Sequence, residues 1–270
     1  MSKIILKTVP AIITIIFMLT SSAFAWGWDS SYIRTDIGSR TLYTYDVANT
    51  LNWISLKRDY VGISIGHIVK FTRVEAGDSD MAAIGLNPDE FNLESISFGL
   101  DMGTNDIYMD FDHSDSTANI FRMDSTPYLG LETSLRSTYQ GTGLSAEIAY
   151  LIGSLSNPKY METRTGDDTP TKLNGNWSES IFRIQADRPF SRQLLCLLGI
   201  DGDFFEVAGK YSGYSTTTLS KKAHYTFSPF NYYLGASYLF SEDLKADLRG
   251  YVSVGTGFIN GYILNISYLI

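Results

Sequence analysis

The chain has 270 residues and a formal net charge of −8 at pH 7, a length that suits one large all-β domain or two small domains. The acidic balance argues against a nucleic-acid-binding protein, because such binding depends on Lys and Arg contacts to phosphate. The single cysteine, Cys196, excludes a fold held by intramolecular disulfides.

Residues 1–25 have the parts of a secretory signal peptide: a basic start, a short apolar run over 9–19 and an A-x-A cleavage motif at 23–25. The apolar run is shorter than the ~20 residues of a spanning helix. We therefore expect cleavage after Ala25 by the general secretion route and one exported domain over 26–270. An uncleaved N-terminal anchor is the alternative.

Period-two alternation of apolar and polar residues recurs along the rest of the chain, and no stretch there approaches the ~18 consecutive apolar residues of a transmembrane helix. Such alternation predicts β-strands. Two weaker strands are predicted at 28–37 and 41–55. The others are predicted at 61–66, 95–102, 107–112, 129–136, 144–152, 182–186, 194–200, 232–240, 244–252 and 262–270.

Short connections rich in turn residues alternate with long ones. The short ones are predicted at 57–59, 103–105, 140–143, 187–191 and 241–243, and the long ones at 74–92, 114–126, 154–177 and 206–223. This alternation is typical of an up-and-down membrane barrel with tight periplasmic turns and long external loops. An even number of strands would place both termini in the periplasm.

The last strand carries an apolar stripe at every second position, formed by Tyr262, Leu264, Ile266, Tyr268 and Ile270. The stripe resembles the C-terminal signature of outer-membrane β-barrel proteins, although Ile270 stands where an aromatic residue is usual. The resemblance implies recognition by the barrel assembly machinery and insertion among outer-membrane lipid and lipopolysaccharide.

Alternation alone does not say which face meets lipid, because a soluble lipocalin-like barrel alternates too. Two features favour lipid outside: the polar faces carry many charges, and about twelve strands enclose more space than side chains fill. We therefore predict an all-β, transmembrane, up-and-down antiparallel β-barrel of about 12 strands in a Gram-negative outer membrane, with the apolar member of each alternation facing lipid. A soluble exported all-β protein is the alternative.

The polar faces would then line the lumen. The predicted lumen-lining residues are Arg34, Asp101, Asp110, Glu132, Arg136, Glu147, Arg183, Lys245, Asp247 and Arg249. Opposed charges across a narrow lumen select solutes, which favours a porin-like passive channel for small polar solutes. The same charges could also pair and fill the barrel, giving a non-conducting structural or surface barrel.

A third interpretation is an outer-membrane lipid-acting hydrolase centred on His113, with Ser114 and Ser116 as candidate nucleophiles. A nucleophilic Ser needs its base within hydrogen-bond reach, and this spacing within a strand does not supply it. The predicted external loops hold acidic pairs that could bind Ca²⁺ or remain solvated; these are Asp78 and Asp80, Asp89 and Glu90, Asp167 and Asp168, and Asp201 and Asp203. No cofactor and no dedicated metal site are predicted.

Overall fold

The structure is a computed structural model, and it describes residues 30–46, 52–70, 91–111, 119–155, 158–163, 172–212, 222–227, 230–253 and 259–270. The predicted signal peptide and cleavage site lie outside these ranges. No helix in the described ranges has the length and hydropathy needed to cross a membrane.

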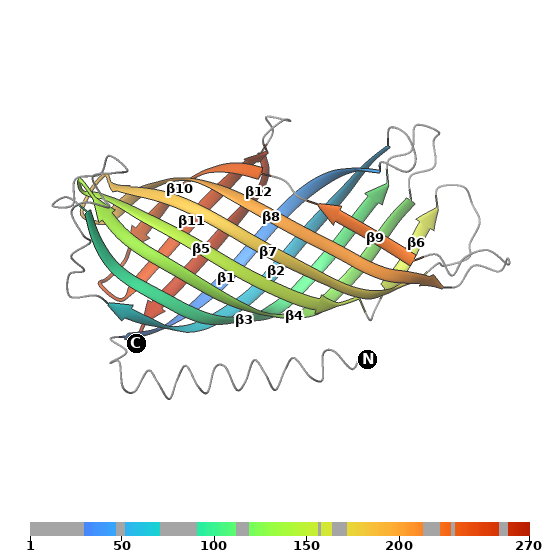
Figure 1. Ribbon diagram of the computed structural model, residues 1–270, viewed down its shortest axis with the longest axis horizontal. Coiled ribbons are helices and arrows are strands. Elements are labelled where there is room, and N and C mark those ends of the chain that lie inside the picture. Colours follow the sequence, from blue (N-terminus) through green and yellow to red (C-terminus); the bar gives the residue numbers. More distant parts are fainter. Residues whose placement is uncertain are drawn as a thin grey trace, which may run out of the picture.

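The described chain forms antiparallel strands throughout (Figure 1). They are β1 (Ser30–Asp46), β2 (Asn52–Lys70), β3 (Phe91–Phe111), β4 (Asn119–Tyr139), β5 (Thr142–Ser154), β6 (Pro158–Thr163), β7 (Lys172–Pro189), β8 (Leu194–Ser212), β9 (Lys222–Phe227), β10 (Phe230–Leu239), β11 (Leu244–Ser253) and β12 (Ile259–Leu269).

The sheet closes into a barrel of ten strands. The ring runs β1-β2-β3-β4-β5-β7-β8-β10-β11-β12, and β12 pairs with β1. The remaining two strands are not members of the ring but add to the barrel wall at the end away from the termini. β6 pairs only with the start of β4, and β9 pairs only with the last part of β8. The predicted all-β antiparallel barrel is confirmed, but the count of about twelve strands is too high.

Two predicted turns caused the miscount. Residues 57–59 lie inside β2, paired on both sides with β1 and β3, and residues 103–105 lie inside β3. Charged residues, Gly and Asn resemble turn residues in a sequence, but pairing on both edges satisfies their backbone groups and keeps them in the strand. The predicted strands at 95–102 and 107–112 therefore merge into β3. The predicted strand at 41–55 is wrong, because residues 41–46 belong to β1 and residues 52–55 begin β2, which continues through the predicted strand at 61–66.

The two ends of the barrel differ. At the terminal end, where β1 begins and β12 ends, β4 and β5 are joined by a tight turn in which Gln140 and Gly141 have φ of 49° and 72°. Two positive φ values are the mark of a type I′ hairpin turn. The four-residue turns at 190–193 and 240–243 lie at the same end, as predicted.

The connection between β2 and β3 also lies at the terminal end, because Lys70 and Phe91 end their strands there. The prediction of an external loop at 74–92, opposite the tight turns, is therefore wrong. The far end carries the connections β1–β2, β3–β4, β6–β7, β8–β9 and β11–β12. Asp201 and Asp203, also predicted in an external loop, lie within β8.

Over the half of the barrel nearest the terminal end, apolar side chains face outward. The exposed side chains there include Ile63, Ile148, Leu198, Leu234 and Ile266, with exposed fractions of 42–66%. Charged side chains such as those of Asp247 and Arg249 on β11 face inward and are buried. An apolar exterior around a polar interior is the arrangement of a membrane-spanning barrel, in which lipid replaces water outside.

Beyond this band the polarity of the strands inverts. On β2, Val61 is exposed on the outer face, but Lys57 follows it there and Leu56 is fully buried inside. On β8, Phe205 is fully buried and its neighbour Glu206 is exposed. The predicted lipid-facing side chain of Ile107 is likewise inside, with 0% exposure. The far part of the barrel is thus built like a water-soluble barrel, with its apolar side chains in the interior.

Strand lengths agree with this division. The shortest ring strands, β10 to β12, have 10, 10 and 11 residues, about the number that spans a bilayer. β3 and β4 have 21 residues each, and Figure 1 shows the walls around β3 to β8 running on well past β10 to β12. We call the part beyond β10–β12 the extension; at ~3.3 Å per residue it adds roughly 30 Å along a strand.

Candidate functional site

The lumen begins at the terminal end as an open polar cavity of about 480 Å³, here called the vestibule. Its mouth includes Glu242 and Asp243 in the β10–β11 turn, and its floor includes Glu147 and Arg249. A second cavity of about 40 Å³ continues inward from the same floor residues. That volume holds only a few water molecules, so the polar passage narrows sharply in the middle of the barrel.

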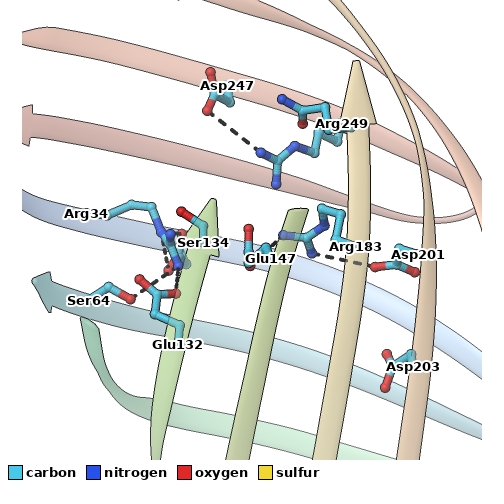
Figure 2. Close-up of polar contacts among 12 residues, drawn as sticks. Arg34, Ser64, Glu132, Ser134, Glu147, Arg183, Asp201, Asp203, Asp247 and Arg249 are labelled. Atoms are coloured by element: carbon cyan, nitrogen blue, oxygen red, sulfur yellow. Dashed lines mark hydrogen bonds and ion pairs between the residues drawn. The ribbon is translucent and has the colours of Figure 1, made fainter. Parts of the chain in front are cut away.

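A chain of ion pairs crosses the lumen at the narrowing. Figure 2 shows its first part, in which Arg183 donates to Glu147 (2.8 Å) and lies 3.5 Å from Asp201. Arg40 continues the chain, since it donates to Asp201 (2.8 Å) and pairs with Asp203 (2.9 Å). The two Arg residues are 93% or more buried. Buried charges are stable only when paired in this way, so the five side chains brace β1, β5, β7 and β8 against one another.

A second charged group lies on the opposite wall. Arg34 donates to Asp36 (2.8 Å) and Glu132 (2.5 Å), and it also bonds Ser64 (3.2 Å). Tyr32 donates its hydroxyl to the other oxygen of Glu132 at 2.6 Å. Both oxygens of Glu132 are therefore occupied, and this group fixes the positions of β1, β2 and β4 at the side of the vestibule.

Farther in, one ion pair lies among apolar side chains. Arg58 donates to Glu179, and their side chains are only 4% and 1% exposed. The guanidinium lies 4.5 Å from the centre of the Tyr60 ring and 5.9 Å from that of Phe205. No cavity described above reaches Glu179. This pair marks the transition from the polar lumen to an apolar one.

Above it, an apolar cluster fills the interior of the extension; we call it the plug. Trp177 stacks on Phe205 with ring centres 5.2 Å apart, and Phe227 of β9 is fully buried against the same cluster. The strands of the extension from β1 round to β9 contribute, apart from β6. The plug consists of Leu42, Leu56, Ile107, Tyr128, Ala149, Leu151, Leu155, Trp177, Ile181, Phe205, Val207 and Phe227.

The wall formed by β10, β11 and β12 has several buried polar atoms without a partner. Ser237, Asp247 and Asn265 lie directly opposite one another across the three strands, and each has an oxygen with no hydrogen-bond partner among the described residues. Arg249 in the same wall has no partner for Nε or Nη1, and its ion pair with Asp247 is long, at 3.9 Å. Buried groups of this kind need a partner such as a water molecule, an ion or a bound solute.

Most of the residues predicted to line the lumen lie in these groups. Arg34 and Glu132 lie together in the Arg34 group, Glu147 and Arg183 in the ion-pair chain, and Lys245 pairs with Asp247 at 3.0 Å beside Arg249. Two others lie apart from these groups. Asp101 is buried and accepts from Tyr128 at 3.4 Å, and Arg136 lies near the mouth.

Arg136 makes a two-point contact with Asp187, 3.0 Å for each nitrogen, and a third bond to Glu94. For Asp110 the structure describes the backbone within β3 and not the side chain.

Several charged residues of the lumen were not among the predicted ones. The sequence places Arg58 in what reads as a turn and Asp201 and Asp203 in what reads as a loop, while Arg40 and Glu179 lie in weakly alternating stretches. A usable signal was present in β8. Asp201 and Asp203 occupy the alternate positions to Leu198 and Ile200, whose side chains are exposed on the outer face, so the two carboxylates are expected inside. Their role became visible only with the pairing across the barrel.

The predicted hydrolase residues His113, Ser114 and Ser116 lie outside the described residues. The described part of the chain contains no group of three His, Cys, Asp or Glu placed to hold a metal ion.

His67 lies on β2, and its Nδ1 is 2.8 Å from the hydroxyl oxygen of Ser31 on β1. Cys196 is exposed on the outer face of β8.

No protein-family model and no curated protein matches the chain. Solved structures do match it at low identity. The translocator domain of the autotransporter NalP from Neisseria meningitidis is 10% identical, with a TM-score of 0.37 and 97% of each chain covered. The COG4313 outer membrane channel from Pseudomonas putida F1 is 9% identical, with a TM-score of 0.35, 89% of this chain and 94% of that chain covered. The transport unit of the autotransporter AIDA-I from Escherichia coli is 10% identical, with a TM-score of 0.36, 88% of this chain and 89% of that chain covered.

The class of barrel is inferred from the polarity of its own outer face and lumen, and not from the similarity to these solved structures. Its ring of ten strands is closed, its outer face over one half is apolar, and its lumen there is polar and charged. Only lipid satisfies such an exterior, and single-chain barrels of this kind are found in outer membranes. By architecture, the chain is a closed β-barrel of the kind that spans membranes.

Proposed function

We propose that the protein is a porin-like channel for small polar solutes whose lumen is closed at rest by the plug. The observation that carries this proposal is the division of the lumen: a polar vestibule of about 480 Å³ leads to a belt of ion pairs and then to apolar side chains. A cavity of this size accommodates a small solute.

The plug has the properties of a gate. Hydrophobic constrictions stop ions and water by excluding water, and they conduct when they widen enough to become wet. In the described chain the plug consists of side chains of the barrel wall, with Trp177 and Phe205 at its centre. Opening requires these side chains to move together, because they are almost completely buried against one another.

A non-conducting structural barrel is the second candidate. It is favoured by the Arg58–Glu179 pair, which is almost completely buried between opposite walls. A buried pair of this kind stabilises one arrangement of the lumen and opposes widening.

Planar-bilayer recording of the refolded protein separates the two candidates. A gated channel gives brief, discrete openings in the unmodified protein, and Trp177→Ala, which removes the central ring of the plug, prolongs them or raises their conductance. Leu234→Ala, on the outer face, is the matched control and leaves the openings unchanged. If the unmodified protein never opens over the whole voltage range, the channel is refuted and the structural barrel stands.

We further propose the sidedness and the partners of the barrel. The terminal end faces the periplasm, after removal of residues 1–25, and the extension stands outside the cell among lipopolysaccharide. The strand β12, with Tyr262, Ile266, Tyr268 and Ile270 exposed, is the segment that the barrel assembly machinery would bind. Replacing Tyr268 and Ile270 by Asn should reduce the amount of folded protein in outer-membrane fractions, with Cys196→Ser as the control.

A further inference from the structure

The wall with the unpartnered polar atoms also lines the vestibule. Lys245, Asp247, Arg249 and Asn265 are all part of its lining. Arg249 additionally lines the narrower cavity beyond. Its side chain is only 8% exposed, so its charge is held away from bulk water at the point where the polar passage narrows.

Arg249 is poorly compensated compared with the other Arg residues of the lumen. Arg34, Arg40 and Arg183 each bond a carboxylate at 2.8 Å or less. Arg249 reaches Asp247 only at 3.9 Å, and Asp247 is itself held by Lys245 at 3.0 Å. Two cations therefore share the Asp247 carboxylate. Glu147 lies on the same cavity floor but accepts its hydrogen bond from Arg183. Among the described residues, Nε and Nη1 of Arg249 have no hydrogen-bond partner.

Acceptors without a donor lie beside these donors without an acceptor. Within the described part of the chain, Oδ1 of Asp247 and Oδ1 of Asn265 are buried and accept no hydrogen bond of good geometry, although the Ser237 hydroxyl lies beside Asp247. The two residues are direct neighbours across β11 and β12. A carboxylate satisfies the guanidinium, because Arg binds planar oxyanions with short, charge-assisted hydrogen bonds. A hydroxyl or amino group next to that carboxylate would satisfy the two acceptors.

We infer that the floor of the vestibule is a binding site for a small monocarboxylate that carries a hydrogen-bond donor on the adjacent carbon, with Arg249 as its anchor. The mouth carries the exposed carboxylates Glu242 and Asp243, which repel anions at long range. Selection of a carboxylate therefore depends on direct contact with the guanidinium of Arg249. The inference deepens the proposed function by naming its solute class, but its test requires no transport.

Isothermal titration calorimetry of the folded protein in detergent micelles tests the site. Sodium lactate should give a saturable heat at constant ionic strength, acetate should bind more weakly because it lacks the donor, and neutral lactamide should give no saturable heat. Arg249→Gln should weaken lactate binding roughly tenfold or more, the usual effect of losing a charge-assisted hydrogen bond. Arg249→Lys, which keeps the charge, should recover part of it.

Lys57→Gln is the matched control, because it removes one positive charge from the outer face of the extension, where the Lys57 side chain is 50% exposed. This variant should bind lactate as the unmodified protein does. Folding of every variant is checked by heat-dependent migration in gel electrophoresis. Equal binding by Arg249→Gln and the unmodified protein overturns the inference, and so does the absence of saturable binding to the unmodified protein. Neither result bears on whether the barrel conducts.

Discussion

The Arg58–Glu179 pair offers a quantitative test of how dry the lumen is. Glu179→Leu removes the carboxylate and leaves the guanidinium of Arg58 buried beside the rings of Tyr60 and Phe205. Removing one partner of a buried pair costs about 3–5 kcal/mol, because the remaining charge loses its close counter-charge and the cavity of about 40 Å³ that Arg58 lines holds only a few water molecules. The equilibrium constant of unfolding should therefore rise by roughly two to three and a half orders of magnitude.

The double replacement should behave differently. With Arg58→Met added to Glu179→Leu, no charge remains buried, and apolar side chains of similar volume take the place of the pair. Such replacements are often neutral or stabilising by about 1–4 kcal/mol. The double-mutant cycle should thus show a coupling energy of several kcal/mol, since the two single changes are far from additive.

The measurement is urea unfolding of the protein in lipid vesicles, followed by tryptophan fluorescence, with the slope of the transition as a check that the surface exposed on unfolding stays the same. The same strand supplies a matched control. Lys57 and Asp59 form an ion pair of 2.9 Å with side chains 50% and 38% exposed. A cycle on that pair should give about 1 kcal/mol or less.

A loss of less than about 1 kcal/mol for Glu179→Leu would refute the reasoning. It would mean that water reaches Arg58 and solvates its charge. The pair would then not hold the lumen in one closed arrangement, and the non-conducting structural barrel would lose its main support.

Three further predictions use the same unfolding assay. Ile148→Arg, on the apolar outer face, should cost about 2–4 kcal/mol, whereas Asn176→Arg, on the outer face of the extension between Ser154 and Ala208, should cost about 0–1 kcal/mol; equal costs would mean that no lipid band exists around Ile148. Gly199→Ala should cost about 1–3 kcal/mol, because a Cβ there would lie 2.3 Å from a buried tyrosine ring. Gly250→Ala, with no atom nearer than 4.0 Å, should be neutral or slightly stabilising, and the opposite order would contradict the packing. Gln140→Asn should stabilise the β4–β5 turn by roughly 0.5 kcal/mol, because Asn tolerates positive φ better than Gln; no gain would argue against the type I′ turn.

Local patterns predicted the strands near the terminal end well. Tyr232, Leu234 and Tyr238 alternate with polar or small residues, and in the structure the three side chains are exposed on the apolar outer face. The tight turn at 140–141 was readable too, since Gly in that position permits positive φ. These features depend on one strand and its nearest neighbours in sequence, so the sequence contains them in full.

The extension was misread for a physical reason. An alternating strand looks the same whether its apolar face meets lipid outside or other apolar side chains inside. Ile107 was readable as an alternating residue, but the direction in which its side chain points depends on where the bilayer ends and on the opposite wall of the barrel. Leu56 and Phe227, more than 170 positions apart in sequence, meet in one cluster only because the ring closes.

The sequence by itself determined that this is an antiparallel barrel with charged residues alternating against apolar ones, because both properties follow from period two along single strands. Only the tertiary structure decided that ten strands close the ring, that Arg40 meets Asp201 and Arg58 meets Glu179 across it, and that Arg249 is left without a close partner. Closure sets which distant side chains face one another, and the energy of a buried charge depends on that partner rather than on its neighbours in the chain.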